Sequence, residues 1–120
     1  MRCLIIDDSA HFGEVARAYL ERQGVNVVGV ATSGAQGVAR TCDLRPDVAL
    51  VDVDLGDESG FDVARSLTEL PCRPHPSVIL ISAQDARDFA ELIDASPAIG
   101  FIPKLELSSD SIEALLRARR

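Results

Sequence analysis

Acidic, hydroxyl and ammonium side chains follow four short apolar runs in this sequence. The runs cover residues 3–6, 48–51, 78–81 and 98–102, and they lead into Asp7-Asp8, Asp52, Ser82 and Pro103-Lys104. Unbroken apolar runs of this length are typical of strands buried on both faces of a parallel sheet. Ligands of such open sheets bind beyond the carboxyl ends of the strands, so these polar side chains are candidates for a single site.

Three of the candidates are carboxylates. If the strands before Asp7, Asp8 and Asp52 are neighbours, their charges repel strongly unless a cation neutralises them. An all-oxygen ligand set without histidine or cysteine favours a hard cation, and few protein ligands leave room for water and a phosphate oxygen, as Mg²⁺ prefers. His11 is expected to be a surface residue of the first helix.

Ser82 and Lys104 add a hydroxyl group and a compact positive charge at the same edge. Lys104 is the single lysine of a chain with eleven arginines. The combined set fits phosphoryl transfer to a carboxylate: an aspartate attacks phosphorus, the cation and the lysine neutralise the phosphoryl oxygens, and the hydroxyl binds one of them.

Amphipathic helix patterns separate the apolar runs. Ser9 and Ser33 are placed to cap the first two helices, Gly24 ends the first, and Asp110 with Glu113 resembles a capping box for the last. The helical patterns cover residues 12–20, 35–42, 61–70, 86–93 and 112–116, and one further strand is expected at residues 25–30. Residues 56–60 are expected to be an irregular loop.

Five strands alternating with five helices predict an α/β fold with right-handed crossovers. The expected architecture is a flavodoxin-like (βα)5 doubly wound parallel sheet of strand order 2-1-3-4-5, which places the ends of the first and third strands side by side. At 120 residues, the chain is expected to be one domain, residues 1–120.

Composition excludes several functions. A net charge of −7 argues against nucleic acid binding by this domain, and the basic residues 117–120 are expected to form a solvated helix end. No apolar run approaches the roughly 20 residues of a membrane span, and the start of the chain lacks a signal-peptide pattern, so a cytoplasmic location is expected. The spacing of Cys3, Cys42 and Cys72 does not match that of metal ligands. Their odd number predicts that they are reduced thiols, and no chemical role is expected for them.

Because its motifs occur in this order and with this spacing, the chain resembles receiver domains of the two-component response regulator family over essentially its whole length. The matching segments are residues 5–9, 51–55 with Gly60 downstream, 81–83 and 100–104. The resemblance implies these roles: Asp52 as phosphoacceptor, Asp7, Asp8, Asp52 and the backbone carbonyl of Asp54 as Mg²⁺ ligands, Lys104 as phosphate-binding lysine, and Ser82 and Phe101 as switch residues. It also places Asp54 and Gln84 beside the phosphoryl group.

Function follows from the same resemblance. A bacterial receiver takes its phosphoryl group from a histidine kinase or phosphotransfer protein and catalyses only its own phosphotransfer and dephosphorylation. The implied output surface, formed by the fourth helix, fifth strand and fifth helix, would contact an effector or a second copy of the chain. No contact with nucleic acid or membrane is expected for this domain. The sequence departs from many receivers at Gly56 and Leu105, where they have proline, and Pro103 precedes the lysine instead.

Three other interpretations remain open. Asp52 and Asp54 resemble the nucleophile and acid/base pair of a haloacid-dehalogenase-like phosphatase, although those enzymes usually place the acidic metal pair after the nucleophile, whereas Asp7 and Asp8 precede it. A flavodoxin or dinucleotide binder is a weaker alternative, since acids and no glycine-rich phosphate loop follow the first strand. A pure interaction module, which would bind no Mg²⁺, is the third alternative.

Overall fold

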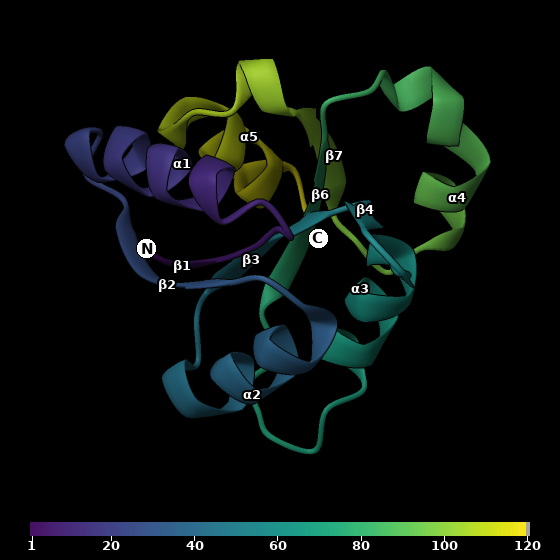
Figure 1. Cartoon of the computed structure of the whole chain (residues 1–120), viewed down its shortest axis with the longest axis horizontal. Helices are drawn as coiled ribbons and strands as arrows, with labels where there is room; N and C mark the ends of the chain where they lie inside the picture. Colours follow the sequence, from purple (N-terminus) through teal and green to yellow (C-terminus); the bar gives the residue numbers. More distant parts are fainter. Residues whose placement is uncertain (120) are drawn as a thin grey trace.

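A five-stranded parallel sheet forms the centre of the molecule in the computed structural model, which describes residues 1–119 (Figure 1). Its order is β2-β1-β3-β6-β7. The strands are β1 (Arg2–Ile6), β2 (Asn26–Ala31), β3 (Val48–Asp52), β6 (Ser77–Ser82) and β7 (Gly100–Pro103). Counted within this sheet alone, the order is 2-1-3-4-5, so the predicted flavodoxin-like topology is confirmed.

Helices cover both faces of the sheet, as the crossovers require (Figure 1). α1 (Ala10–Arg22) and α5 (Ser109–Ala118) lie on one face. α2 (Gly34–Leu44) and α3 (Gly60–Thr68) lie on the other. A 3-10 turn, η1 (Ala86–Phe89), leads into α4 (Ala90–Ala95), and a second one, η2 (Lys104–Glu106), follows β7.

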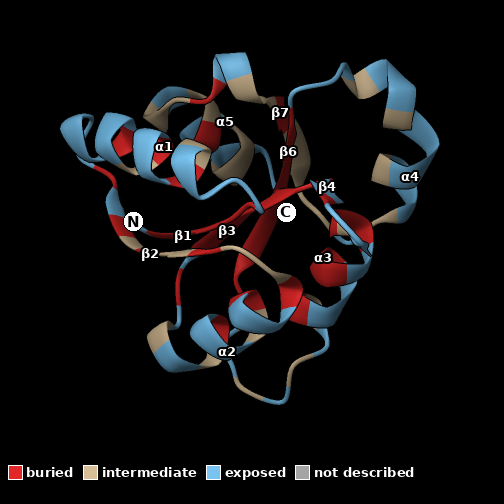
Figure 2. Ribbon diagram, in the orientation of Figure 1, coloured by how far each residue is buried: buried red, intermediate tan, exposed pale blue. Residues whose placement is uncertain are grey.

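The strands divide the core into two clusters because alternate side chains point to opposite faces. In β1, Cys3 and Ile5 pack with the residues of α1 and α5, whereas Leu4 and Ile6 pack with those of α2 and α3. All five residues of β3 are buried, which explains why this run lacks a polar alternation (Figure 2).

Two short strands, β4 (Asp54–Leu55) and β5 (Glu58–Ser59), pair in an antiparallel hairpin directly after β3. The prediction of an irregular loop at residues 56–60 therefore holds for Gly56 and Asp57, which form a turn, and is wrong for residues 58–60. Gly56 makes the turn at φ +73°, a left-handed conformation that suits glycine. Gly60 lies against the backbone of Asp52 and Val53, so closely that a Cβ atom at this position would meet the carbonyl oxygen of Asp52. Its N–H donates a hydrogen bond to the Val53 carbonyl at 2.9 Å.

Several predicted boundaries also shift. Ser9 and Ser33 cap α1 and α2 as expected. The last helix, however, begins with a capping box of Ser108 and Ser111 and not with Asp110 and Glu113. The fourth helix is shorter than its pattern, because residues 86–89 form the 3-10 turn η1.

The cysteine prediction is wrong for two of the three residues. Cys42 on α2 and Cys72 after α3 form a disulfide, with their Cα atoms 5.8 Å apart. Packing of α2 against α3 brings these residues together although 30 positions separate them. Cys3 is a free, buried thiol in β1, and burial raises its pKa to about 12.

The C-terminal end is described up to Arg119, and Arg120 of the expected basic end lies outside the described residues. Within residues 1–119, none of the helices has the length and apolar character needed to cross a membrane.

Candidate functional site

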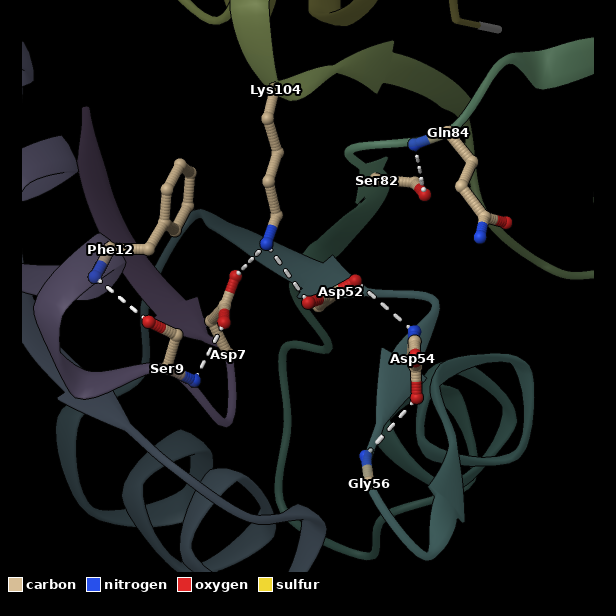
Figure 3. Close-up of polar contacts among 9 residues, drawn as sticks. All are labelled: Asp7, Ser9, Phe12, Asp52, Asp54, Gly56, Ser82, Gln84 and Lys104. Carbon is tan, nitrogen blue, oxygen red and sulfur yellow. Dashed lines mark hydrogen bonds and ion pairs between the residues drawn. The ribbon is translucent and has the colours of Figure 1, made fainter.

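The carboxyl edge of the sheet brings the predicted site residues together (Figure 3). Asp52 ends β3 and Ser82 ends β6, while Asp7 and Lys104 directly follow β1 and β7. The register aligns these strand ends, since Ile6 pairs with Val51, Asp52 with Ile81 and Ser82 with Pro103.

The three carboxylates form a compact cluster. One oxygen atom from each of Asp7, Asp8 and Asp52 lies within 4.8 Å of the others. Asp8 is exposed, but Asp7 is 0% and Asp52 only 5% exposed. Asp52 is therefore largely shielded from solvent although it stands at the end of a strand.

Burial is also the main reason why the pKa of Asp52 is raised, and the nearby charge of Asp7 acts in the same direction. Two contacts partly oppose this. The backbone N–H of Asp54 donates to Asp52 Oδ1 at 3.1 Å, and Lys104 Nζ donates to Oδ2 at 3.0 Å. Each oxygen of Asp52 is thus held by one donor, which fixes the orientation of the carboxylate.

Lys104 lies between two of the acids. Its Nζ is 2.7 Å from Asp7 Oδ2 and 3.0 Å from Asp52 Oδ2, and its side chain is 17% exposed. Burial would lower the pKa of Lys104, but its contacts with the two carboxylates outweigh that cost and raise it. The ammonium group is therefore charged across the physiological pH range.

The acidic cluster has the chemistry of a site for a hard divalent cation. Asp7 Oδ2 is fully buried and accepts no hydrogen bond of good geometry within residues 1–119, although it forms the ion pair with Lys104. A buried carboxylate oxygen with unused acceptor capacity, next to two further carboxylates, suits an ion such as Mg²⁺. Asp7, Asp8 and Asp52 are the side chains that fit this role.

A pocket of about 190 Å³ opens over the cluster. Its lining consists of Asp8, Asp52, Asp54, Ser82, Ala83, Gln84 and Lys104. A larger hollow of about 650 Å³ lies between α2 and α3, and none of the predicted site residues lines it. The smaller pocket is therefore the candidate site.

Ser82 and Phe101 lie on the opposite side of Asp52 from Asp7. Ser82 is buried, and its Oγ accepts a hydrogen bond from the backbone N–H of Gln84 at 2.9 Å (Figure 3). Phe101 is half-buried on β7 and lines a groove of about 270 Å³ together with Ala90 and Ile93 of α4.

Sequence reasoning missed one residue of the site. The ring centroid of Phe12 lies 4.2 Å from Lys104 Nζ, although Phe12 was expected only as an apolar position of the first helix. Its neighbour His11 is exposed, as predicted. No spacing rule connects Phe12 with Lys104, and the register of α1 against the sheet is what brings them together.

A parallel (βα)5 sheet with paired acids after β1, an acid at the end of β3 and a lysine after β7 defines a class of signalling domain, and comparisons with known proteins agree. The family model for the response regulator receiver domain matches residues 3–116. The chain therefore belongs to this family and is a receiver domain of the two-component response regulators.

Individual relatives support the same assignment. The chain is 29% identical to the chemotaxis protein CheY of Thermotoga maritima, covering 95% of this chain and 93% of that protein. The signal receiver domain of the response regulator NarL from Mycobacterium tuberculosis is 32% identical, with a TM-score of 0.78 over 98% of this chain and 97% of that one.

Longer proteins also match. A protein-glutamate methylesterase/protein-glutamine glutaminase of Alkalilimnicola ehrlichii is 32% identical over 105 residues, which are 87% of this chain but 27% of that protein. The chain thus spans about a quarter of the length of this relative. None of the comparisons supports the haloacid-dehalogenase-like interpretation.

Proposed function

We propose that this receiver accepts a phosphoryl group on Asp52 in a Mg²⁺-dependent reaction and that a histidine kinase or phosphotransfer protein supplies the group. The observation that carries this proposal is the position of Lys104 Nζ, which touches both Asp7 and Asp52 at the edge of a pocket lined by acidic residues. An ammonium group at this point can stabilise the negative charge of the Asp52 carboxylate before the transfer and that of a phosphoryl oxygen after it.

Asp52 is the best nucleophile among the four acids. It is buried, lines the pocket and has both oxygens oriented by donors, whereas Asp8 and Asp54 are exposed. Asp7 is buried but does not line the pocket. The pKa of Asp52 is raised mainly by burial, so this carboxylate is more basic and less solvated than an exposed one. Both properties favour its role as a nucleophile.

The transfer balances without redox chemistry. A lone pair of an Asp52 oxygen forms the new O–P bond, the bond from phosphorus to the donor's imidazole nitrogen breaks, and its electron pair stays on that nitrogen. A Mg²⁺ ion at Asp7, Asp8 and Asp52, with the backbone carbonyl of Asp54 as a further ligand, would neutralise charge on the phosphoryl oxygens. Lys104 neutralises the rest.

The test is phosphorylation by acetyl phosphate, followed by borohydride trapping and mass spectrometry. We expect label on Asp52, no label in Asp52→Asn, and at least a tenfold loss when a chelator removes Mg²⁺. Asp57→Asn is the matched control, because Asp57 is an exposed acid close in sequence that does not line the pocket. Label on another residue, equal labelling in chelator, or turnover of small phosphate esters without a phosphoprotein would contradict the proposal.

Output is proposed to pass through the surface formed by α4, β7 and α5. A phosphoryl group on Asp52 gives the hydroxyl of Ser82 a charged acceptor, so this side chain would leave the N–H of Gln84 and move toward the phosphate. Phe101 has no polar tip, and full burial of its ring would contribute roughly 1.5 to 3 kcal/mol at most. This surface would then contact an effector or a second copy of the chain.

Amide chemical shifts before and after phosphorylation test this coupling. We expect shifts across α4, β7 and α5 in the wild type, and shifts confined to the acidic pocket in Ser82→Ala, which should still accept phosphate on Asp52. Wild-type shifts in both Ser82→Ala and Phe101→Ala would show that neither residue transmits the signal.

A further inference from the structure

Phe12 contacts the one lysine of the chain. Its ring centroid is 4.2 Å from Lys104 Nζ, and Figure 3 shows the ring beside the end of the lysine side chain, on the side away from Ser82. Aromatic rings attract cations over their faces at this distance. The ammonium group is therefore flanked by Asp7, Asp52 and an aromatic ring.

The backbone of Phe12 is connected to Asp7 through Ser9. Ser9 Oγ accepts a hydrogen bond from the N–H of Phe12 at 3.2 Å, and the N–H of Ser9 donates to Asp7 Oδ1 at 2.9 Å. The other oxygen of Asp7, Oδ2, contacts Lys104 Nζ, and Lys104 Nζ in turn contacts the ring of Phe12. The four residues thus form a closed set of contacts between the start of α1 and the loop after β7 (Figure 3).

From these contacts we propose that Phe12 is a positioning residue for phosphoryl transfer: its ring holds the ammonium group of Lys104 over Asp52. The inference rests on the proposed function of Asp52. A cation–π contact is suited to this task because the ring attracts the cation but accepts no strong hydrogen bond. Asp7 and Asp52 each take one of the three N–H groups of Lys104, and the third therefore stays available for a phosphoryl oxygen, whereas a third carboxylate or a water molecule would occupy it.

The ring of Phe12 also borders a groove that reaches Lys104. This groove of about 340 Å³ runs along α1 to Lys104, and its lining includes Phe12, Val15, Tyr19 and Leu105. Phe12 is the part of this wall that touches the ammonium group. A smaller aliphatic side chain at this position would open the groove toward Lys104 and let water compete for its N–H groups.

Nuclear magnetic resonance of the unphosphorylated protein tests the contact itself. Because Lys104 is the single lysine, labelling with ¹³C-lysine gives one Cε signal. The ring current of Phe12 should shift its protons upfield in the wild type and in Phe12→Tyr, but not in Phe12→Leu. Tyr19→Leu is the matched control, since Tyr19 is an aromatic residue of the same helix and groove.

Phosphorylation kinetics with acetyl phosphate test the positioning role. We expect the rate constant at saturating donor to fall about fivefold in Phe12→Leu, with recovery in Phe12→Tyr and no change in Tyr19→Leu. A series of fluorinated phenylalanines at position 12 keeps the size of the ring but weakens its negative face, so the rate should fall stepwise with each fluorine.

Each outcome decides the matter. A Phe12→Leu variant that loses the Cε shift but keeps the wild-type rate, or a fully fluorinated ring that keeps it, would overturn the positioning role. A wild-type Cε signal in Phe12→Leu would overturn the contact. If the wild-type chain accepts no phosphate on Asp52, the proposed function fails, while the lysine signal still reports whether the ring contact exists.

Discussion

The two sides of the acidic pocket are built differently. On one side, α1 has thirteen residues, a serine cap and three buried positions, and its start is joined to Asp7 and Lys104 through Ser9 and Phe12. On the other side, α4 has six residues, lacks a side-chain cap and contains no buried residue, and the 3-10 turn before it has none either.

Under the proposed function, this difference would separate two tasks. Phosphoryl transfer requires groups held in fixed positions, and the α1 side provides them. Signal output requires a segment that can change conformation at low cost, and few buried contacts are the physical basis of such a segment. Ser82 Oγ accepts a local hydrogen bond from Gln84, and Phe101 is half-buried beside a groove, so a rearrangement on the α4 side would move partly buried side chains and no fully buried residue of α4.

The largest expected contrast is in stability. Leu20 on α1 is 0% exposed and Leu92 on α4 is 54% exposed. Leu20→Ala should lower the free energy of unfolding by about 3 kcal/mol, because it leaves a cavity, whereas Leu92→Ala should change it by less than about 0.5 kcal/mol. Urea denaturation of both variants measures this. Similar losses in the two variants would remove the distinction between the sides.

The disulfide offers the next largest effect. Cys42–Cys72 closes a loop between α2 and the segment after α3, and its reduction should lower the free energy of unfolding by about 3 kcal/mol through the entropy of the unfolded chain. Denaturation with and without a reductant checks this, with the Cys42→Ser and Cys72→Ser double variant as control. Hydrogen exchange should remain slower in α1 than in α4 after reduction, since the disulfide touches neither helix.

Much of this architecture could be predicted from the sequence because four of the five sheet strands are apolar runs with chemically capable residues at or just after their carboxyl ends. The order of the strands follows from the rules for crossovers, so Asp7, Asp52, Ser82 and Lys104 could be assigned to one edge before any coordinates. Such a prediction depends on the position along a strand and not on the details of packing.

The features that escaped prediction all depend on packing between segments far apart in sequence. Cys42 and Cys72 meet because α2 lies against α3, and Phe12 meets Lys104 because of the register of α1 on the sheet. The β4–β5 hairpin has strands of two residues, which are too short to show a period of alternation. The start of α5 depends on which serine, Ser108 or a neighbour, adopts the cap conformation.

A substitution that keeps the charge should distinguish the two sides in activity. Lys104→Arg should reduce phosphorylation by acetyl phosphate about tenfold, because a planar guanidinium group cannot fit between Asp7 and Asp52 as a compact ammonium group does. Arg87→Lys, on the exposed turn before α4, should have no effect. Wild-type rates for Lys104→Arg would show that a charge alone is sufficient there.

The smallest expected effect concerns how much the buried charge of Asp52 lowers the stability of the unphosphorylated protein. Burial raises the pKa of Asp52, so the folded state binds a proton there more tightly than the unfolded chain does. The contribution of this group to stability is therefore present at low pH and is lost as the pH rises through the raised pKa. In Mg²⁺-free buffer at neutral pH, Asp52→Asn should consequently be more stable than the wild type and melt at a higher temperature.

Two further conditions make this last prediction specific to Asp52. Lowering the pH below the raised pKa should remove the difference, since the wild-type carboxyl group is then neutral as well. Adding Mg²⁺ should stabilise the wild type more than Asp52→Asn, because the ion offsets the repulsion among Asp7, Asp8 and Asp52. Asp54→Asn, which alters an exposed acid, should match the wild type in Mg²⁺-free buffer. If Asp52→Asn is no more stable than the wild type, Lys104 already offsets the charge of Asp52. In that case the α1 side of the pocket carries no excess repulsion for a cation to relieve.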